Sequence, residues 1–88
     1  MKSGLYSIYD MKAKFYSKPF QAQNDEVAIR TIANSFKDPQ ASQSEYVINP
    51  EDFNLARVGY FNDNDGTIES NLEFLIAFTA FVEKDNEE

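Results

Sequence analysis

The sequence predicts an α+β fold: a small antiparallel sheet of about four strands, in β-β-α-β-β order, with one amphipathic helix packed on it. Three observations predict it. Residues 24–37 carry apolar side chains at helical spacing, several other segments have strand composition, and hairpin-type turn signals connect those segments. With 88 residues, 42% of them hydrophobic, the chain can bury one core. We expect a single α+β domain over residues 1–83 and an acidic flexible tail at residues 84–88.

The N-terminal part of the chain predicts two strands. Residues 4–10 are rich in aromatic and β-branched types, which favour a strand. Residues 10–13 are polar enough to form a turn, and residues 14–17 suit a short second strand. Pro19 has no backbone N–H, so it ends the second strand or places it at a sheet edge.

The helix over residues 24–37 has the clearest pattern. Asn24 is a good N-cap, and the two acidic residues that follow it complement the positive end of the helix dipole. Pro39 prevents continuation of the helix. The apolar side expected to pack on the sheet consists of Val27, Ile29, Ile32, Ala33 and Phe36.

A polar loop at residues 38–45 and a turn at residues 49–52 follow, with a short strand or turn between them at residues 46–48. Residues 53–61 then predict a strand in which Gly59 marks a bulge or a close backbone approach. Asp63-Asn64-Asp65-Gly66 predicts a hairpin turn, with Asp65-Gly66 suited to a type I′ connection.

The segment from Leu72 to Val82 fits two structures. Apolar residues alternate with period two, as in a strand, but Ser70 and Glu73 also form a capping box in front of a helical stripe of phenylalanines. Periodicity does not decide between strand and helix here.

Composition excludes many activities. The chain has no Cys and no His, so it lacks the residues for a disulfide, a thiolate or imidazole metal site, or a Ser-His triad. Asp63 and Asp65 resemble an EF-hand loop, but Phe61 and Leu72 stand where its first and last ligands belong. No apolar run could span a membrane, and no apolar segment of a secretion signal follows Lys2. We expect no enzyme activity, no metal, no cofactor and no membrane partner.

The net charge of −7 is unevenly distributed, because residues 1–23 carry four lysines and one aspartate, or +3. Lysines that meet phosphates and aromatic rings that stack on bases are the usual means of binding single-stranded nucleic acid. The candidate nucleic-acid-binding residues are Lys2, Lys12, Lys14, Lys18, Tyr9 and Tyr16, with Arg30 added if the exposed side of the helix borders the same face. The same pattern also fits lysines that guard a sheet edge, or a homodimer face.

An ordered series of short motifs resembles a known family. The series is Tyr6-Ser7-Ile8-Tyr9-Asp10, Lys12-Ala13, Pro19-Phe20, Asn24-Asp25, Ala28-Ile29-Arg30, Pro50-Glu51-Asp52-Phe53-Asn54-Leu55, Gly59, and Phe61-Asn62-Asp63 through Gly66. It is similar, over about residues 4–83, to the small nonstructural protein of gokushovirus-like microviruses, often called the phage open-reading-frame-five protein. The resemblance implies a DNA-binding protein that acts while the phage replicates its single-stranded genome in the cytoplasm of the infected bacterium. It implies no catalytic residue, and it favours a strand over residues 73–82.

Two functions follow as expectations. The first is a non-enzymatic phage accessory protein that binds single-stranded DNA in viral genome replication. The alternative is a dimeric protein-interaction module that recruits or inhibits phage or host replication proteins without direct DNA contact.

Overall fold

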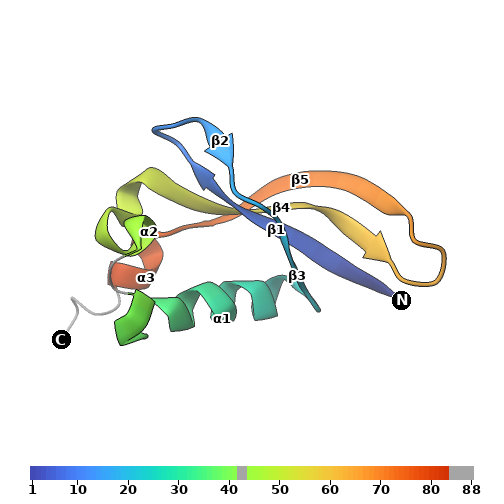
Figure 1. Cartoon of the computed structure of the whole chain (residues 1–88), viewed down its shortest axis with the longest axis horizontal. Coiled ribbons are helices and arrows are strands. Elements are labelled where there is room, and N and C mark those ends of the chain that lie inside the picture. The colour runs from blue at the N-terminus through green and yellow to red at the C-terminus, as the bar shows by residue number, and fades with distance from the viewer. Residues whose placement is uncertain (42–43, 84–88) are drawn as a thin grey trace.

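The computed structural model describes residues 1–41 and 44–83, and it shows an antiparallel sheet with helices gathered on one side and at one end (Figure 1). The expected tail at residues 84–88 lies outside the described residues, as do two residues of the loop expected at 38–45. In chain order the elements are β1 (Lys2–Asp10), β2 (Phe15–Tyr16), β3 (Phe20–Ala22), α1 (Asp25–Ser35), η1 (Pro39–Ala41), α2 (Glu45–Ile48), η2 (Pro50–Asp52), β4 (Phe53–Asn62), β5 (Ile68–Ala77) and α3 (Thr79–Glu83).

The strand order in the sheet is β2-β1-β4-β5, and β3 also pairs with β1, on the edge that β4 leaves free. Every pairing is antiparallel. Ser17, between β2 and β3, continues the contact with β1, because its hydroxyl accepts a bond from the Ile8 N–H at 3.0 Å and its own N–H donates to the Ile8 carbonyl at 2.9 Å. The α+β fold predicted from the sequence is confirmed.

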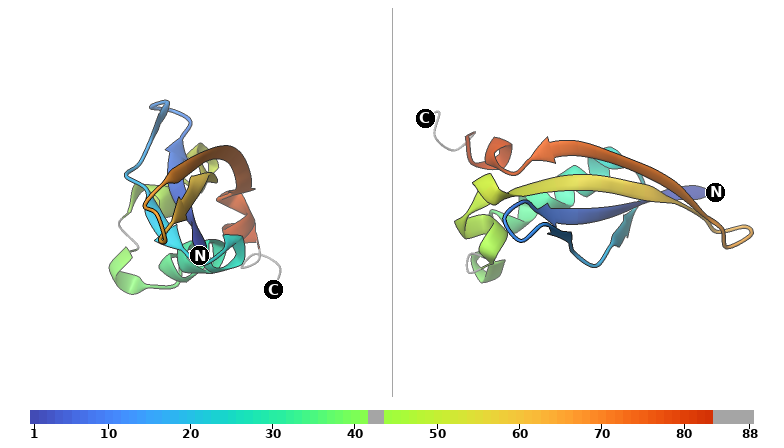
Figure 2. Two further views of the ribbon diagram at one scale, coloured as in Figure 1. Left: turned by 90° about the vertical axis from the view of Figure 1, so that its right-hand side faces the viewer. Right: turned by 90° about the horizontal axis from the view of Figure 1, so that it is seen from above.

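The hydrophobic core lies between the sheet and α1, with α2 and α3 closing one end (Figure 1). Tyr6, Leu55 and Phe78 are fully buried there. The opposite face of β1, β4 and β5 has no described element over it, as the view from above shows (Figure 2). Helices therefore cover one face of the sheet and leave the other uncovered.

Asn24 caps α1 as predicted, since its side-chain oxygen accepts a bond from the Val27 N–H at 2.9 Å. Gly59 marks a predicted irregularity, because the register of β4 and β5 shifts between Arg57 and Gly59. A Cβ atom at Gly59 would collide with the backbone oxygen of Glu69, so the close approach of the two strands requires glycine there.

Four local expectations are wrong. Residues 46–48 lie in the short helix α2, where Tyr46 packs its ring against Phe36, Phe53 and Phe78. The turn after β4 is not type I′ at Asp65-Gly66, because Gly66 has φ +76° while Asp65 does not have a positive φ.

The other two corrections concern missed or shifted boundaries. The strand expected over residues 73–82 ends at Ala77, where buried Phe78 turns into the core and α3 begins, and Ser70 and Glu73 lie within β5 rather than at a helix start. The short strand β3, which follows Pro19, was missing from the predicted order.

Candidate nucleic-acid interface

The β1–β2 hairpin presents lysines to solvent. The Asp10 carboxylate accepts bonds from the backbone N–H groups of Lys12 and Ala13, both at 3.0 Å, and thereby fixes the turn. Lys14 completes the turn in the left-handed region, at φ 63°. Lys12, Lys14 and Lys18 are all exposed. Among the described residues, Lys12 has one weak ion pair, to Asp52 at 4.0 Å, and Lys14 and Lys18 have no carboxylate within 4 Å.

Three aromatic rings form a row across the uncovered face, and two of them belong to the hairpin that carries Lys12 and Lys14. Tyr9 and Tyr16 are cross-strand partners, with ring centroids 4.5 Å apart. The Tyr9 ring is also 5.7 Å from the ring of Phe74 on β5. Ala56 on β4 pairs with Phe74 and is small and buried. The rings of Tyr9 and Phe74 can therefore approach each other across β4. We call Tyr16, Tyr9 and Phe74 the aromatic row.

The pattern of the sequence identified Tyr9 and Tyr16 but missed Phe74. Phe74 is 53% exposed although it is a large apolar residue in the middle of a long strand. The period-two alternation of β5 was the available signal. It assigns Phe74 to one face, but it does not say that this face is uncovered or that Tyr9 lies beside it.

The structure does not bring Lys2 and Arg30 to the same place. Lys2 begins β1, roughly 27 Å from Asp10 at the other end of the strand. Its ammonium donates to Glu69 at 2.9 Å, and this bond raises the pKa of Lys2. Arg30 is exposed on α1, which packs on the opposite side of the sheet from the aromatic row.

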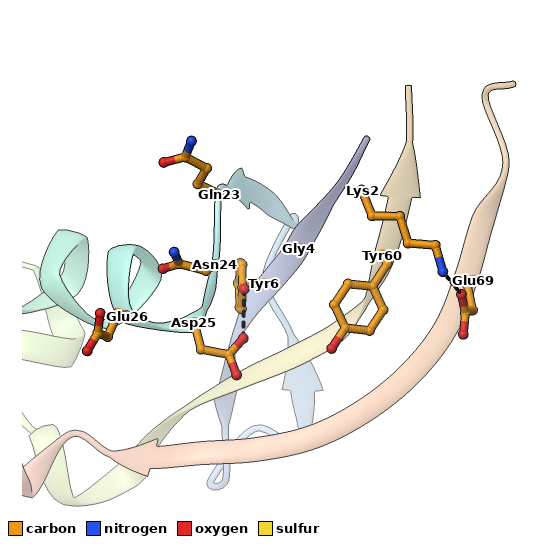
Figure 3. Close-up of a pocket in the computed structure, with 9 residues that line it drawn as sticks. All are labelled: Lys2, Gly4, Tyr6, Gln23, Asn24, Asp25, Glu26, Tyr60 and Glu69. Carbon is orange, nitrogen blue, oxygen red and sulfur yellow. Dashed lines mark hydrogen bonds and ion pairs between the residues drawn. The ribbon is translucent and has the colours of Figure 1, made fainter. Parts of the chain in front are cut away.

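A hollow of about 520 Å³ lies between the start of α1 and strands β1, β4 and β5 (Figure 3). The Tyr6 hydroxyl donates to Asp25 at 2.8 Å on one side of it, and Lys2 pairs with Glu69 on the other. Glu26 adds a further carboxylate to the lining. Three carboxylates against one lysine make this hollow unfavourable for a phosphate.

Arg57 lies beside this hollow and holds α1 to the sheet. Its side chain is 8% exposed and is paired with Asp25 at 2.6 Å and with Glu73 at 2.5 Å. Its guanidinium also donates to Asn71 and lies 5.3 Å from the Tyr60 ring centre. Burial opposes its charge, but the bond to Asp25 and the charge of that carboxylate outweigh this and raise the pKa of Arg57.

The Arg57 network therefore fixes the fold rather than offering a free cation to a ligand. Burial, and next the bond to Asp25, likewise raise the pKa of the Tyr6 hydroxyl. Every hydrogen-bonding group at the centre of this network has a partner within the chain, and among the described residues no buried side-chain polar atom is left unpaired. The exposed lysines and the aromatic row remain as the candidate interface.

Fold and interface together define a small α+β protein whose sheet is covered by helices on one face and displays aromatic rings on the other, with exposed lysines in the loops that flank β2. The chain belongs to the phage ORF5 protein family, whose model matches residues 3–81. Comparison with curated proteins and with solved structures gave no match. Within residues 1–41 and 44–83, no helix is both long and apolar enough to cross a membrane.

Proposed function

We propose that this phage protein is a non-enzymatic accessory protein that binds single-stranded DNA during replication of the viral genome, in the cytoplasm of the infected bacterium. The observation that carries the proposal is the aromatic row, two of whose rings belong to the hairpin that carries exposed Lys12 and Lys14, with exposed Lys18 two residues after Tyr16. The exposed rings of Tyr16 and Phe74 provide surfaces on which bases stack whatever their sequence. The ammonium groups of Lys14 and Lys18, which have no carboxylate within 4 Å among the described residues, provide partners for phosphates.

The charges set the expected strength of binding. Three lysines that each release about 0.7 counterion give a log–log salt slope near −2 on single-stranded DNA. Repulsion from a chain of net charge −7 opposes binding. We therefore expect a Kd on the order of micromolar at physiological salt, at the strong end of the range for non-specific binding. Lys2 and Arg30 are outside the proposed interface because of their distant positions.

The test is a titration of labelled single-stranded DNA, about 12 nucleotides long to match a single-domain site, at low and at physiological salt. Lys14→Glu/Lys18→Glu is expected to abolish binding. Tyr16→Ala is expected to weaken it by roughly 5- to 150-fold, the loss of about 1–3 kcal/mol of base stacking. Circular dichroism checks that each variant remains folded.

Arg30→Glu is the matched control, because it reverses one charge on the far side of the sheet and should change affinity only through the net charge. Equal losses in Arg30→Glu and Tyr16→Ala would contradict the proposed interface. Absence of wild-type binding at low salt would contradict DNA binding altogether.

A second candidate function is that of a dimeric interaction module that recruits or inhibits phage or host replication proteins without touching DNA. Three exposed apolar side chains of β5 favour this candidate: Ile68, Leu72 and Phe74. If wild-type protein does not bind DNA, this candidate replaces the first.

A further inference from the structure

A second hollow, of about 370 Å³, lies on the helical side of the sheet, where α1, the end of β5 and α3 come together. Its size is within the range of about 300–1,000 Å³ that is usual for small-molecule sites. The aromatic row lies on the opposite face of the sheet, so the two surfaces are separate. The apolar lining of the hollow consists of Ile29 and Ala33 of α1, Phe36 at its end, Ile76 of β5, and Ala80 and Phe81 of α3.

Two alanines leave this hollow unfilled. Ala33 and Ala80 line it from different helices, and a longer apolar side chain at either position would occupy part of its volume. The aromatic wall of the hollow is held in place, because the Phe36 ring is 5.3 Å from the Phe81 ring and 5.9 Å from the ring of fully buried Phe78. A wall that is already ordered loses little conformational freedom when an apolar group enters.

The charge beside the hollow indicates which ligand it fits. Lys37 is the one charged side chain among the described residues of the lining, and it is exposed. Within residues 1–41 and 44–83, its ammonium has no carboxylate within 4 Å. Arg30, nearly two helical turns earlier, is also exposed and has no such partner in the same ranges. An apolar hollow with a free ammonium at its rim suits an apolar chain that ends in an anionic group.

We propose that this hollow binds the aliphatic chain of a monocarboxylate of the fatty-acid class, with the carboxylate paired to Lys37. Burial of the chain supplies most of the binding free energy. A ligand with one negative charge is repelled only weakly by a protein of net charge −7, whereas an acidic peptide or an anionic membrane would be repelled more strongly. The inference does not depend on DNA binding and is tested without DNA.

The experiment titrates decanoate into the isotope-labelled full chain and follows backbone amide signals by NMR. Saturable binding is expected below about 1 mM, with the shifts concentrated at residues 29–37 and 76–81. Decylamine is the matched ligand, with the same chain and the opposite charge. It should bind roughly 1.4- to 5-fold more weakly, the effect of one exposed ion pair, although the net charge of the protein favours an amine. Lys37→Glu should reverse this order.

Ala33→Leu tests the hollow itself and should weaken decanoate binding roughly 10-fold or more, because leucine takes the place of the chain. Ala80→Leu is the second variant in case Ala33→Leu does not fold, as judged by circular dichroism. Thr31→Leu is the matched control, since it adds the same side chain at an exposed position of α1 and should bind decanoate like wild type.

Four results would overturn the proposal. The first is no saturable binding of decanoate to wild type up to about 1 mM. The second is a set of shifts centred on the aromatic row instead of on α1 and α3. The third is wild-type affinity in the folded leucine variants of the hollow. The fourth is tighter binding of decylamine than of decanoate by wild type, or an unchanged order of the two ligands in Lys37→Glu.

Discussion

Replacement of Arg57 by methionine should destabilise the protein more than any surface substitution. Methionine keeps much of the apolar stem but removes the bonds to Asp25 and Glu73. Removal of one partner from a buried ion pair costs about 3–5 kcal/mol. The Asp25 and Glu73 side chains are 43% and 62% exposed, so water can solvate them once the guanidinium is gone. We therefore reduce the expected loss to about 2–3 kcal/mol.

That loss is a large part of the roughly 4–13 kcal/mol expected for a domain of this size, and it should lower Tm by about 10–20 °C. Urea unfolding followed by circular dichroism measures it directly. Arg30→Met removes the same group from an exposed helix position and should cost less than about 0.5 kcal/mol. If Arg57→Met loses no more than this control, Arg57 does not hold α1 to the sheet.

A double-mutant cycle adds a stricter check on the same network. Arg57→Met and Asp25→Asn remove opposite ends of one ion pair, so their effects should not add, with a coupling of at least about 0.5 kcal/mol. Additive losses would show that the two side chains stabilise the fold independently.

Three further changes test other parts of the structure. Gly59→Ala should cost about 1–3 kcal/mol in urea unfolding, because the new Cβ meets the Glu69 carbonyl, and an unchanged midpoint would exclude that close contact. Asn24→Ala should lose about 1 kcal/mol with the N-cap, and a neutral result would mean that the cap contributes nothing. Because the pKa of Tyr6 is raised above its ordinary value of 10.0, the folded chain keeps a proton that the unfolded chain releases, so wild-type stability should fall as pH rises above 10.0. Tyr6→Phe should show a smaller alkaline loss, while giving up about 1 kcal/mol at neutral pH with the bond to Asp25, and equal alkaline slopes would contradict the assignment.

Local signals in the sequence were sufficient for most of the fold. The N-cap at Asn24 and the period of α1 depend on neighbours in the chain, and a glycine within a strand is itself a sign of an irregularity. The end of β5 does not depend on neighbours in the chain, because the apolar alternation continues past Ala77. The Phe78 N–H donates to the Phe53 carbonyl at 3.1 Å and the Phe78 side chain is fully buried, so packing in the core ends the strand.

Only part of the candidate site could be predicted from the sequence, because the rest depends on contacts between segments that are distant in the chain. Lys12, Lys14, Tyr9 and Tyr16 belong to one hairpin, so their proximity follows from local pattern. Phe74 lies beside them only because β4 is the single strand between β1 and β5 in the sheet. The pairing of Asp25 with Arg57, 32 residues apart, likewise has no local signature.

The aromatic row joins two rings of the β1–β2 hairpin to Phe74 of β5, which is remote from them in the sequence, so the complete row exists only while the sheet is assembled. The unfolded chain has no equivalent surface. A ligand held by all three rings is therefore bound by the native state alone, and its binding free energy adds to the free energy of unfolding through mass action. At a ligand concentration 100 times Kd this linkage is worth about 2.7 kcal/mol. For a small domain with no disulfide and no cysteine, occupancy of the sheet surface would make a considerable difference to the lifetime of the folded protein in the cell.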